Sequence, residues 1–122
     1  MFNRFIKFSF QKEGIHRYPA AATDPLLADV KFLAHPHRHI FHFYVTVGVE
    51  HNDRDIEFII AKRWAESQYA TGAMEIDYKS CEMLAEELIR ALRVRFGNRY
   101  IKVEVYEDDE NGGIVECFPE EE

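Results

Sequence analysis

The chain has 122 residues, of which 47% are hydrophobic and 30% are charged, a size and composition typical of one domain with an ordinary hydrophobic core. We therefore expect a single domain over residues 1–122 with a short acidic tail at residues 119–122, and a two-domain enzyme is excluded. The formal net charge of −7 disfavours sequence-independent binding of nucleic-acid phosphates, because such binding needs a basic face.

Neither the cysteines nor the N-terminal residues indicate export or a membrane. Cys81 and Cys117 lie far apart without a CxxC pairing, so we expect reduced thiols rather than a disulfide framework. Residues 1–14 alternate apolar and polar side chains and lack the continuous apolar segment of a signal peptide. Apolar runs are also far shorter than the ~20 residues of a membrane-spanning helix. The sequence predicts a cytoplasmic protein that contacts neither membrane nor nucleic acid.

The first half of the chain predicts two strands separated by a long loop. Apolar residues at even positions over residues 2–12 follow the period of a half-buried strand. Residues 14–34 break this pattern with two prolines, so we expect a surface loop with a short helical turn near Leu26 and Leu27. Residues 37–49 (HRHIFHFYVTVGV) are rich in β-branched and aromatic residues, which predicts the second strand.

The second half predicts two helices joined by a short loop. Asp53 or Asp55 is a suitable N-cap for a first helix ending near Tyr69, with an apolar face of Phe58, Ile59, Ala61, Trp64 and Ala65. Ser80 is the N-cap expected for a second helix over residues 81–96, where apolar residues recur with the helical period before Gly97.

A β-hairpin follows the second helix. Residues 100–107 and 114–118 alternate apolar and polar side chains on either side of turn residues 110–113. The predicted fold class is therefore α+β, with the element order β-β-α-α-β-β.

Histidines form the most informative cluster, because five of the six lie between residues 16 and 42. Alternate strand residues point to one face about 7 Å apart, so His37 and His39 can bind one ion between them. His16, just after the first strand, is the natural third ligand. Three neutral imidazoles leave one tetrahedral position of Zn²⁺ open, as in catalytic sites. The alternative is a solvated histidine-rich loop. His35 and His42 are expected to orient a ligand or to lie at the surface, and not to bind the ion.

Five segments occur in the order of a known family's motifs. The segment FSFQKEGIHRYP resembles a strand FSF that leads to a metal-binding histidine, and HRHIFHFYVTV resembles HGHNYRVEVTV. The positions of IEFIIAK, SCEMLAEELIRAL and VEVYEDDENGGIVE match those of MDFxxLK, PTxENLAxxIxxxL and VxVxETxxxxAxY. These motifs belong to 6-pyruvoyl-tetrahydropterin synthase and 6-carboxy-tetrahydropterin synthase, of the tunnelling fold, which the chain resembles over nearly its whole length.

The resemblance implies a fold, a metal and a substrate. The fold is a ββααββ subunit with an antiparallel four-stranded sheet packed on two antiparallel helices, assembled into a ring-like trimer or hexamer with sites between subunits. The implied Zn²⁺ ligands are His16, His37 and His39. Glu107 corresponds to the glutamate that anchors the pterin ring, although it could also be an exposed acid at a strand end. Dihydroneopterin triphosphate is the implied substrate of a lyase reaction, as in pterin and queuosine biosynthesis.

The sequence departs from the family where proton transfer is expected. Leu33 occupies the position of the family's cysteine, and no histidine follows His51 to form its Asp-His pair between the helices. Asp77 is an acid in that region without its partner. Cys81 at the start of a helix is a candidate thiolate, but a buried and inert thiol is the interpretation that we favour.

Two functions follow from these observations. The first is a metal-dependent enzyme acting on a pterin or purine-like heterocycle, with an unassigned proton carrier for which His51, Asp77 and His35 are candidates. The alternative is an inactive relative that binds metal, a pterin-like ligand, or both without turnover. An interaction domain with neither ligand is the third interpretation if the histidine cluster binds nothing.

Overall fold

Five strands form one mixed sheet in the computed structural model, which describes residues 1–69 and 71–121. The strand order is β3-β1-β2-β4-β5, and every neighbouring pair is antiparallel except β1 and β3. The strands are β1 (Arg4–His16), β2 (His37–Val49), β3 (Met74–Asp77), β4 (Ile101–Glu107) and β5 (Asn111–Cys117). The α+β class is confirmed, whereas the prediction of four antiparallel strands is wrong in detail.

β3 is the strand that the sequence prediction lacks, because the segment between the helices was expected to be a loop. It is short and pairs on one side only, with the end of β1. Met74 and Ile76 point inward and are each 6% exposed, while Glu75 and Asp77 face outward. Two inward side chains are too few to make a recognisable alternating pattern. Ala70 of the expected loop and Glu122 of the expected tail lie outside the described residues.

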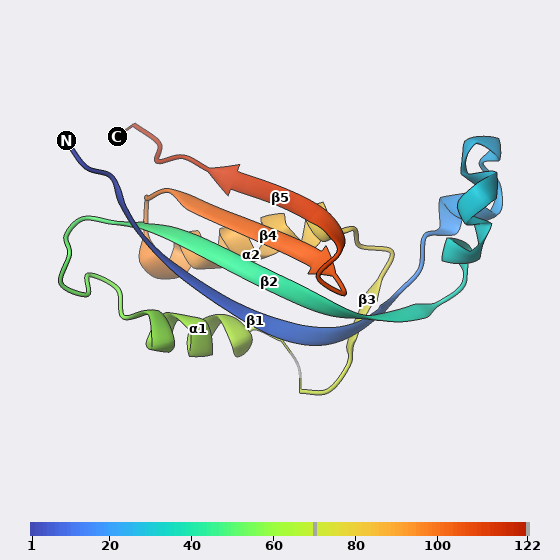
Figure 1. The fold of residues 1–122 in the computed structure, drawn as a ribbon, viewed down its shortest axis with the longest axis horizontal. Coiled ribbons are helices and arrows are strands. Elements are labelled where there is room, and N and C mark those ends of the chain that lie inside the picture. The colour runs from blue at the N-terminus through green and yellow to red at the C-terminus, as the bar shows by residue number, and fades with distance from the viewer. Residues whose placement is uncertain (70, 122) are drawn as a thin grey trace.

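Two α-helices accompany the sheet, α1 (Phe58–Glu66) and α2 (Cys81–Phe96). Figure 1 shows α2 behind β2 and β4 and α1 beside β1, with the two helices running in opposite directions. The predicted α2 is confirmed, including its N-cap, because the Ser80 side chain accepts a hydrogen bond from the Met83 backbone N–H. Gly97 ends the helix with a φ of 92°, a conformation that glycine adopts without steric cost.

The prediction for α1 is wrong at both ends. Its N-cap is Glu57 rather than Asp53 or Asp55, and the helix ends at Glu66 rather than near Tyr69. Asp55 is not free to cap the helix, since its carboxylate accepts hydrogen bonds from the Glu50 backbone and from Arg99. The buried face is also narrower than predicted: Ala61 and Ala65 are buried and Trp64 partly buried, but Phe58 and Ile59 are about half exposed.

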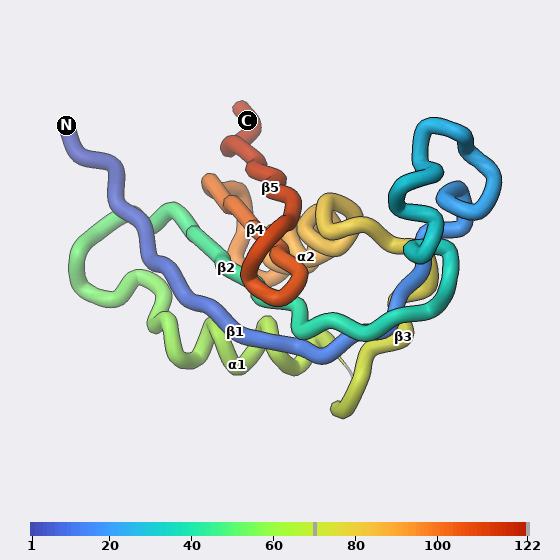
Figure 2. The backbone as a smooth tube through the Cα atoms, turned by 45° about the vertical axis from the view of Figure 1, so that its right-hand side comes forward, coloured from blue at the N-terminus to red at the C-terminus, as the bar shows by residue number. Residues whose placement is uncertain are grey.

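Residues 17–36, which we call the arm, project from one end of the sheet (Figure 1 and Figure 2). The arm contains two 3-10 helices, η1 (Pro19–Ala22) and η2 (Pro25–Ala34), where a loop with a short helical turn was predicted. β1 is longer than the predicted 2–12, since Gly14 and His16 still pair with His39 and His37 of β2. Gly14 is required there, because a Cβ would lie 2.8 Å from the Phe41 ring.

The hairpin turn also lies earlier than predicted. Asp108 and Asp109 adopt positive φ values of 54° and 58°, and β5 already begins at Asn111. Aspartate and asparagine tolerate this left-handed conformation better than most residues. The glycines at 112 and 113 therefore belong to β5, and the turn consists of acidic residues next to the end of β4.

One face of the sheet carries the core. The inward side chains of β2 (Phe41, Phe43, Val45 and Val47) are completely buried, as are the alternate side chains Ile101, Val103 and Val105 of β4. Phe10 of β1 stacks on Phe43 with the ring centroids 4.8 Å apart. Among residues 1–69 and 71–121, no helix combines the length and apolar character needed to cross a membrane.

Candidate metal centre

The three predicted ligands lie together on the inward face of β1 and β2, at the end of the two strands next to the arm. His16 is paired directly with His37, and His39 is two residues further along the same face of β2. Their ring centroids are 4.6 Å (His16 to His37), 5.3 Å (His16 to His39) and 4.9 Å (His37 to His39) apart. One nitrogen from each ring lies within 4.8 Å of the others, so the cluster could hold a metal ion.

Each imidazole is held from behind by a hydrogen bond at Nδ1. The acceptors are the Lys79 carbonyl for His16 at 3.4 Å, the His35 carbonyl for His37 at 2.7 Å, and the Asp108 carboxylate for His39 at 2.6 Å. A carbonyl or an ionised carboxylate can only accept, so each Nδ1 carries the hydrogen. The lone pair of each neutral ring is therefore on Nε2, the tautomer seen when an outer acceptor orients a metal-binding histidine.

The three Nε2 atoms face one another and lack hydrogen-bond partners. All three are buried, and none has a partner within the described part of the chain. Buried polar nitrogens are normally satisfied, because leaving one unpaired costs free energy. A cation that accepts three lone pairs is the simplest way to satisfy them together.

Glu107 adds a negative charge beside the cluster. Its two carboxylate oxygens lie 3.3 Å from His16 Nε2 and 3.4 Å from His39 Nε2, and these contacts are ion pairs only when the imidazoles are protonated. When the ring hydrogens are on Nδ1, the lone pairs of His16 Nε2 and His39 Nε2 face those of the Glu107 oxygens. This arrangement is repulsive when empty and favourable when a cation lies between the groups.

Burial favours the neutral form of His16. It lowers the pKa of this histidine below the ordinary value, although the hydrogen bond to the Lys79 carbonyl and the charge of Glu107 act in the opposite direction. Coordination requires a neutral imidazole, so a lowered pKa reduces the competition from protons. The hydrogen bond from His39 likewise lowers the pKa of Asp108, which keeps that carboxylate ionised.

A cleft of about 680 Å³ opens beside the cluster. His16, His37 and Glu107 lie along one side of it, and the arm and the start of α2 form the others. Tyr18 and Tyr78 line this cleft with half-exposed aromatic rings. The cleft thus joins a cation site, a carboxylate and apolar walls, a combination typical of small-molecule sites.

Leu33 and Cys81 both line the cleft, but neither supplies a proton carrier. Leu33 contributes an aliphatic side chain. Burial, together with the charges of Glu107 and Glu82, raises the pKa of Cys81 to about 12. The prediction that Cys81 is buried is confirmed, and its raised pKa favours the thiol over the thiolate.

The other candidate proton carriers do not line the cleft, although Asp77 pairs with His16 through the backbone of β3. His51 follows the opposite end of β2, roughly 40 Å from His37 at the usual rise per strand residue. Asp77 pairs with Arg17 at 3.7 Å on the exposed side of β3. The exposed His35 contributes its backbone carbonyl, and the side chain of His42 lines a separate cleft with residues of α1. Sequence reasoning missed Lys79 and Asp108, since their contacts with the ligands arise only from the fold.

Arg38 between the two histidines does not enter the site. Its guanidinium forms an ion pair with Glu13 at 2.8 Å on the opposite face of the sheet. Odd and even residues of a strand point to opposite faces, so the Arg38 side chain lies on the other face of β2 from His37 and His39.

Comparison of the sequence with protein-family models and with curated proteins finds no match.

Proposed function

We propose that the protein binds one Zn²⁺ through the Nε2 atoms of His16, His37 and His39 and uses it on a ligand in the adjacent cleft. The observation that carries this proposal is the convergence of three buried, unpartnered Nε2 atoms, each from a ring oriented at Nδ1. The bound ion would supply Lewis-acid polarisation of a ligand oxygen. Three protein ligands leave a coordination position for that oxygen.

The ligand that we propose is a planar heterocycle of the pterin or purine type. Glu107 suits the amino and ring N–H groups of such a molecule, because a carboxylate accepts two parallel hydrogen bonds. Tyr18 and Tyr78 supply aromatic surface in the same cleft for contact with a flat ring. Dihydroneopterin triphosphate is the substrate to test first, in a lyase reaction of the 6-pyruvoyl- or 6-carboxy-tetrahydropterin synthase type.

A specific observation favours the alternative of binding without turnover. The cleft is lined by Leu33, at the position where the sequence resemblance implies a cysteine, and by Cys81, whose raised pKa keeps the thiol protonated. Neither Asp77 nor His51 lines the cleft. A protein that only binds the metal and a ligand, for storage or regulation, would need the three histidines and the cleft. It would not need proton-transfer residues.

A titration and a turnover assay distinguish these functions. Zinc-loaded protein is titrated with neopterin, and separately incubated with dihydroneopterin triphosphate followed by chromatography. We expect neopterin binding that weakens about 10- to 100-fold in Glu107→Gln, because a charged hydrogen-bond acceptor is lost. Glu110→Gln, an exposed acid of the same hairpin, is the matched control and should bind as wild type.

Each outcome of this experiment has one meaning. Turnover supports the enzyme, and binding without turnover supports the alternative. Absence of both binding and turnover in zinc-loaded protein would refute the heterocycle proposal while leaving the metal site intact.

We also propose a ring-like homo-oligomer. β3 and β5 are the two edges of the sheet, and β5 carries the exposed Ile114. Open edges favour pairing with another chain. Light scattering at micromolar concentration should give the mass of a trimer or hexamer, and a monomer throughout that range would contradict the assembly.

A further inference from the structure

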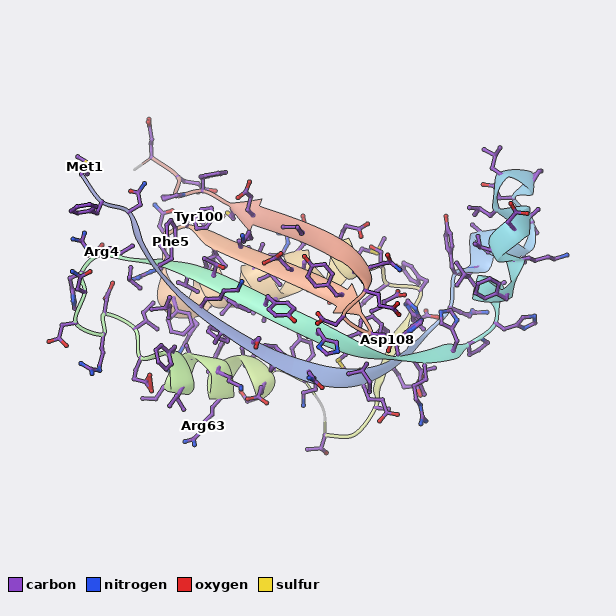
Figure 3. The ribbon with its side chains drawn as sticks, viewed as in Figure 1. Met1, Arg4, Phe5, Arg63, Tyr100 and Asp108 are labelled. Carbon is purple, nitrogen blue, oxygen red and sulfur yellow. The ribbon has the colours of Figure 1, made fainter. Side chains whose placement is uncertain are left out.

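We propose that Asp108 is a positioning residue of the metal centre, which fixes the tautomer of His39 and increases the affinity of the site for its ion. This inference rests on the proposed metal site and deepens it. Asp108 comes from the β4–β5 turn, whereas the ligand it orients belongs to β2 (Figure 3). The turn therefore acts on the metal through a residue that does not touch it.

Three hydrogen bonds from one residue fix this contact. Asp108 Oδ2 accepts from His39 Nδ1 at 2.6 Å, and Oδ1 accepts from the Ile40 backbone N–H at 2.9 Å. The Asp108 backbone N–H donates to the Ile40 carbonyl at 2.7 Å. With both oxygens and the main chain engaged, the carboxylate has little freedom to turn away from His39.

The charge of Asp108 distinguishes His39 from the other two ligands. His16 and His37 donate to neutral carbonyl oxygens, whereas His39 donates to a carboxylate over the shortest of the three distances. A charged acceptor withdraws the Nδ1 hydrogen more strongly and leaves Nε2 a better electron donor. His39 is therefore the most strongly donating ligand of the cluster.

The turn offers a conservative variant and a matched control. Asp108 has a φ of 54°, a conformation that asparagine also tolerates, so Asp108→Asn removes the charge without forcing a new backbone. Asp109 is its neighbour in the same turn, with a φ of 58° and a carboxylate that accepts from the Tyr44 hydroxyl. Asp109→Asn makes the same chemical change away from the histidines.

The test measures zinc affinity by competition with a chromophoric chelator for wild type, Asp108→Asn and Asp109→Asn. We expect a loss of about 10- to 100-fold in Asp108→Asn, the usual effect of removing an outer-shell partner, and no change in Asp109→Asn. The visible spectrum of Co²⁺-loaded protein should also shift in Asp108→Asn alone. Without metal, wild type, Asp108→Asn and Asp109→Asn should have equal melting temperatures. A purely structural role of Asp108 would instead lower the melting temperature of Asp108→Asn.

A zinc affinity equal to that of wild type in Asp108→Asn would overturn the inference. An equal loss of zinc affinity in Asp108→Asn and Asp109→Asn, together with lower melting temperatures of both metal-free variants, would also overturn it. Wild-type protein that binds neither zinc nor cobalt would overturn the proposed metal site itself, and with it this inference. A second measurement needs no variant: the ¹⁵N shifts of His39 in metal-free wild type should report the hydrogen on Nδ1. A hydrogen mainly on Nε2 would refute the positioning role.

Discussion

Zinc content should fall from one ion per chain to nearly none when His37 or His39 is replaced by alanine. The proposed site has three histidine ligands, and a two-imidazole remnant would lose one of only three protein bonds to the ion. We expect an affinity loss greater than the roughly 100-fold upper range for an outer-shell residue, because a direct bond is removed. Elemental analysis after purification without chelators measures the effect.

His35→Ala and His42→Ala are the matched controls for this loss. His35 supports His37 through its backbone carbonyl, which alanine retains, and His42 lines a different cleft. Both variants should keep about one ion per chain. Metal retained in both His37→Ala and His39→Ala, or wild-type protein without a stoichiometric transition metal, would refute the assignment of the site and the enzyme proposal.

Phe43→Ala should destabilise the fold by about 3–5 kcal/mol, the usual cost of removing a buried aromatic ring and leaving a cavity. Phe43 is completely buried in the centre of the sheet and contacts Phe10 and Tyr69, with ring centroids 4.8 Å and 5.2 Å away. Urea unfolding of the metal-free protein measures the free energy of unfolding without a contribution from bound ion.

Phe2→Ala is the control, because Phe2 is 79% exposed and lies before β1. Its effect on the free energy of unfolding should stay within about 0.5 kcal/mol. A loss below about 1 kcal/mol in Phe43→Ala would contradict the burial of Phe43 and its stacking on Phe10.

The parts of the fold that the sequence predicts well are those with long, regular patterns. β2 carries alternating inward side chains along its full length, and α2 combines a serine cap, a helical period and a terminal glycine. α1 is harder to predict, because alanines form most of its buried face. In addition, the Asp55 carboxylate, which is expected to cap the helix, accepts a hydrogen bond from Arg99 instead. The short β3 leaves too little pattern to detect.

The ligand cluster follows from the sequence for a simple geometric reason. His37 and His39 share a face of any regular strand, and His16 ends the strand that pairs with them. The support around the cluster does not follow, because the contacts of Lys79 and Asp108 cross between distant segments. Glu107 is found beside the cluster, while its role toward a heterocycle stays a prediction.

The pairing of His16 with His37 has a consequence for the arm, whose two ends these residues bracket. An ion bound to both would act as a cross-link at the base of residues 17–36, comparable with a disulfide that closes a loop. Once the ends are joined, doubling the length of such a loop costs only about 0.6 kcal/mol in chain entropy. Residues 18–34 of the arm could therefore be lengthened, shortened or exchanged and so reshape one wall of the cleft, while His35 keeps its hydrogen bond to His37.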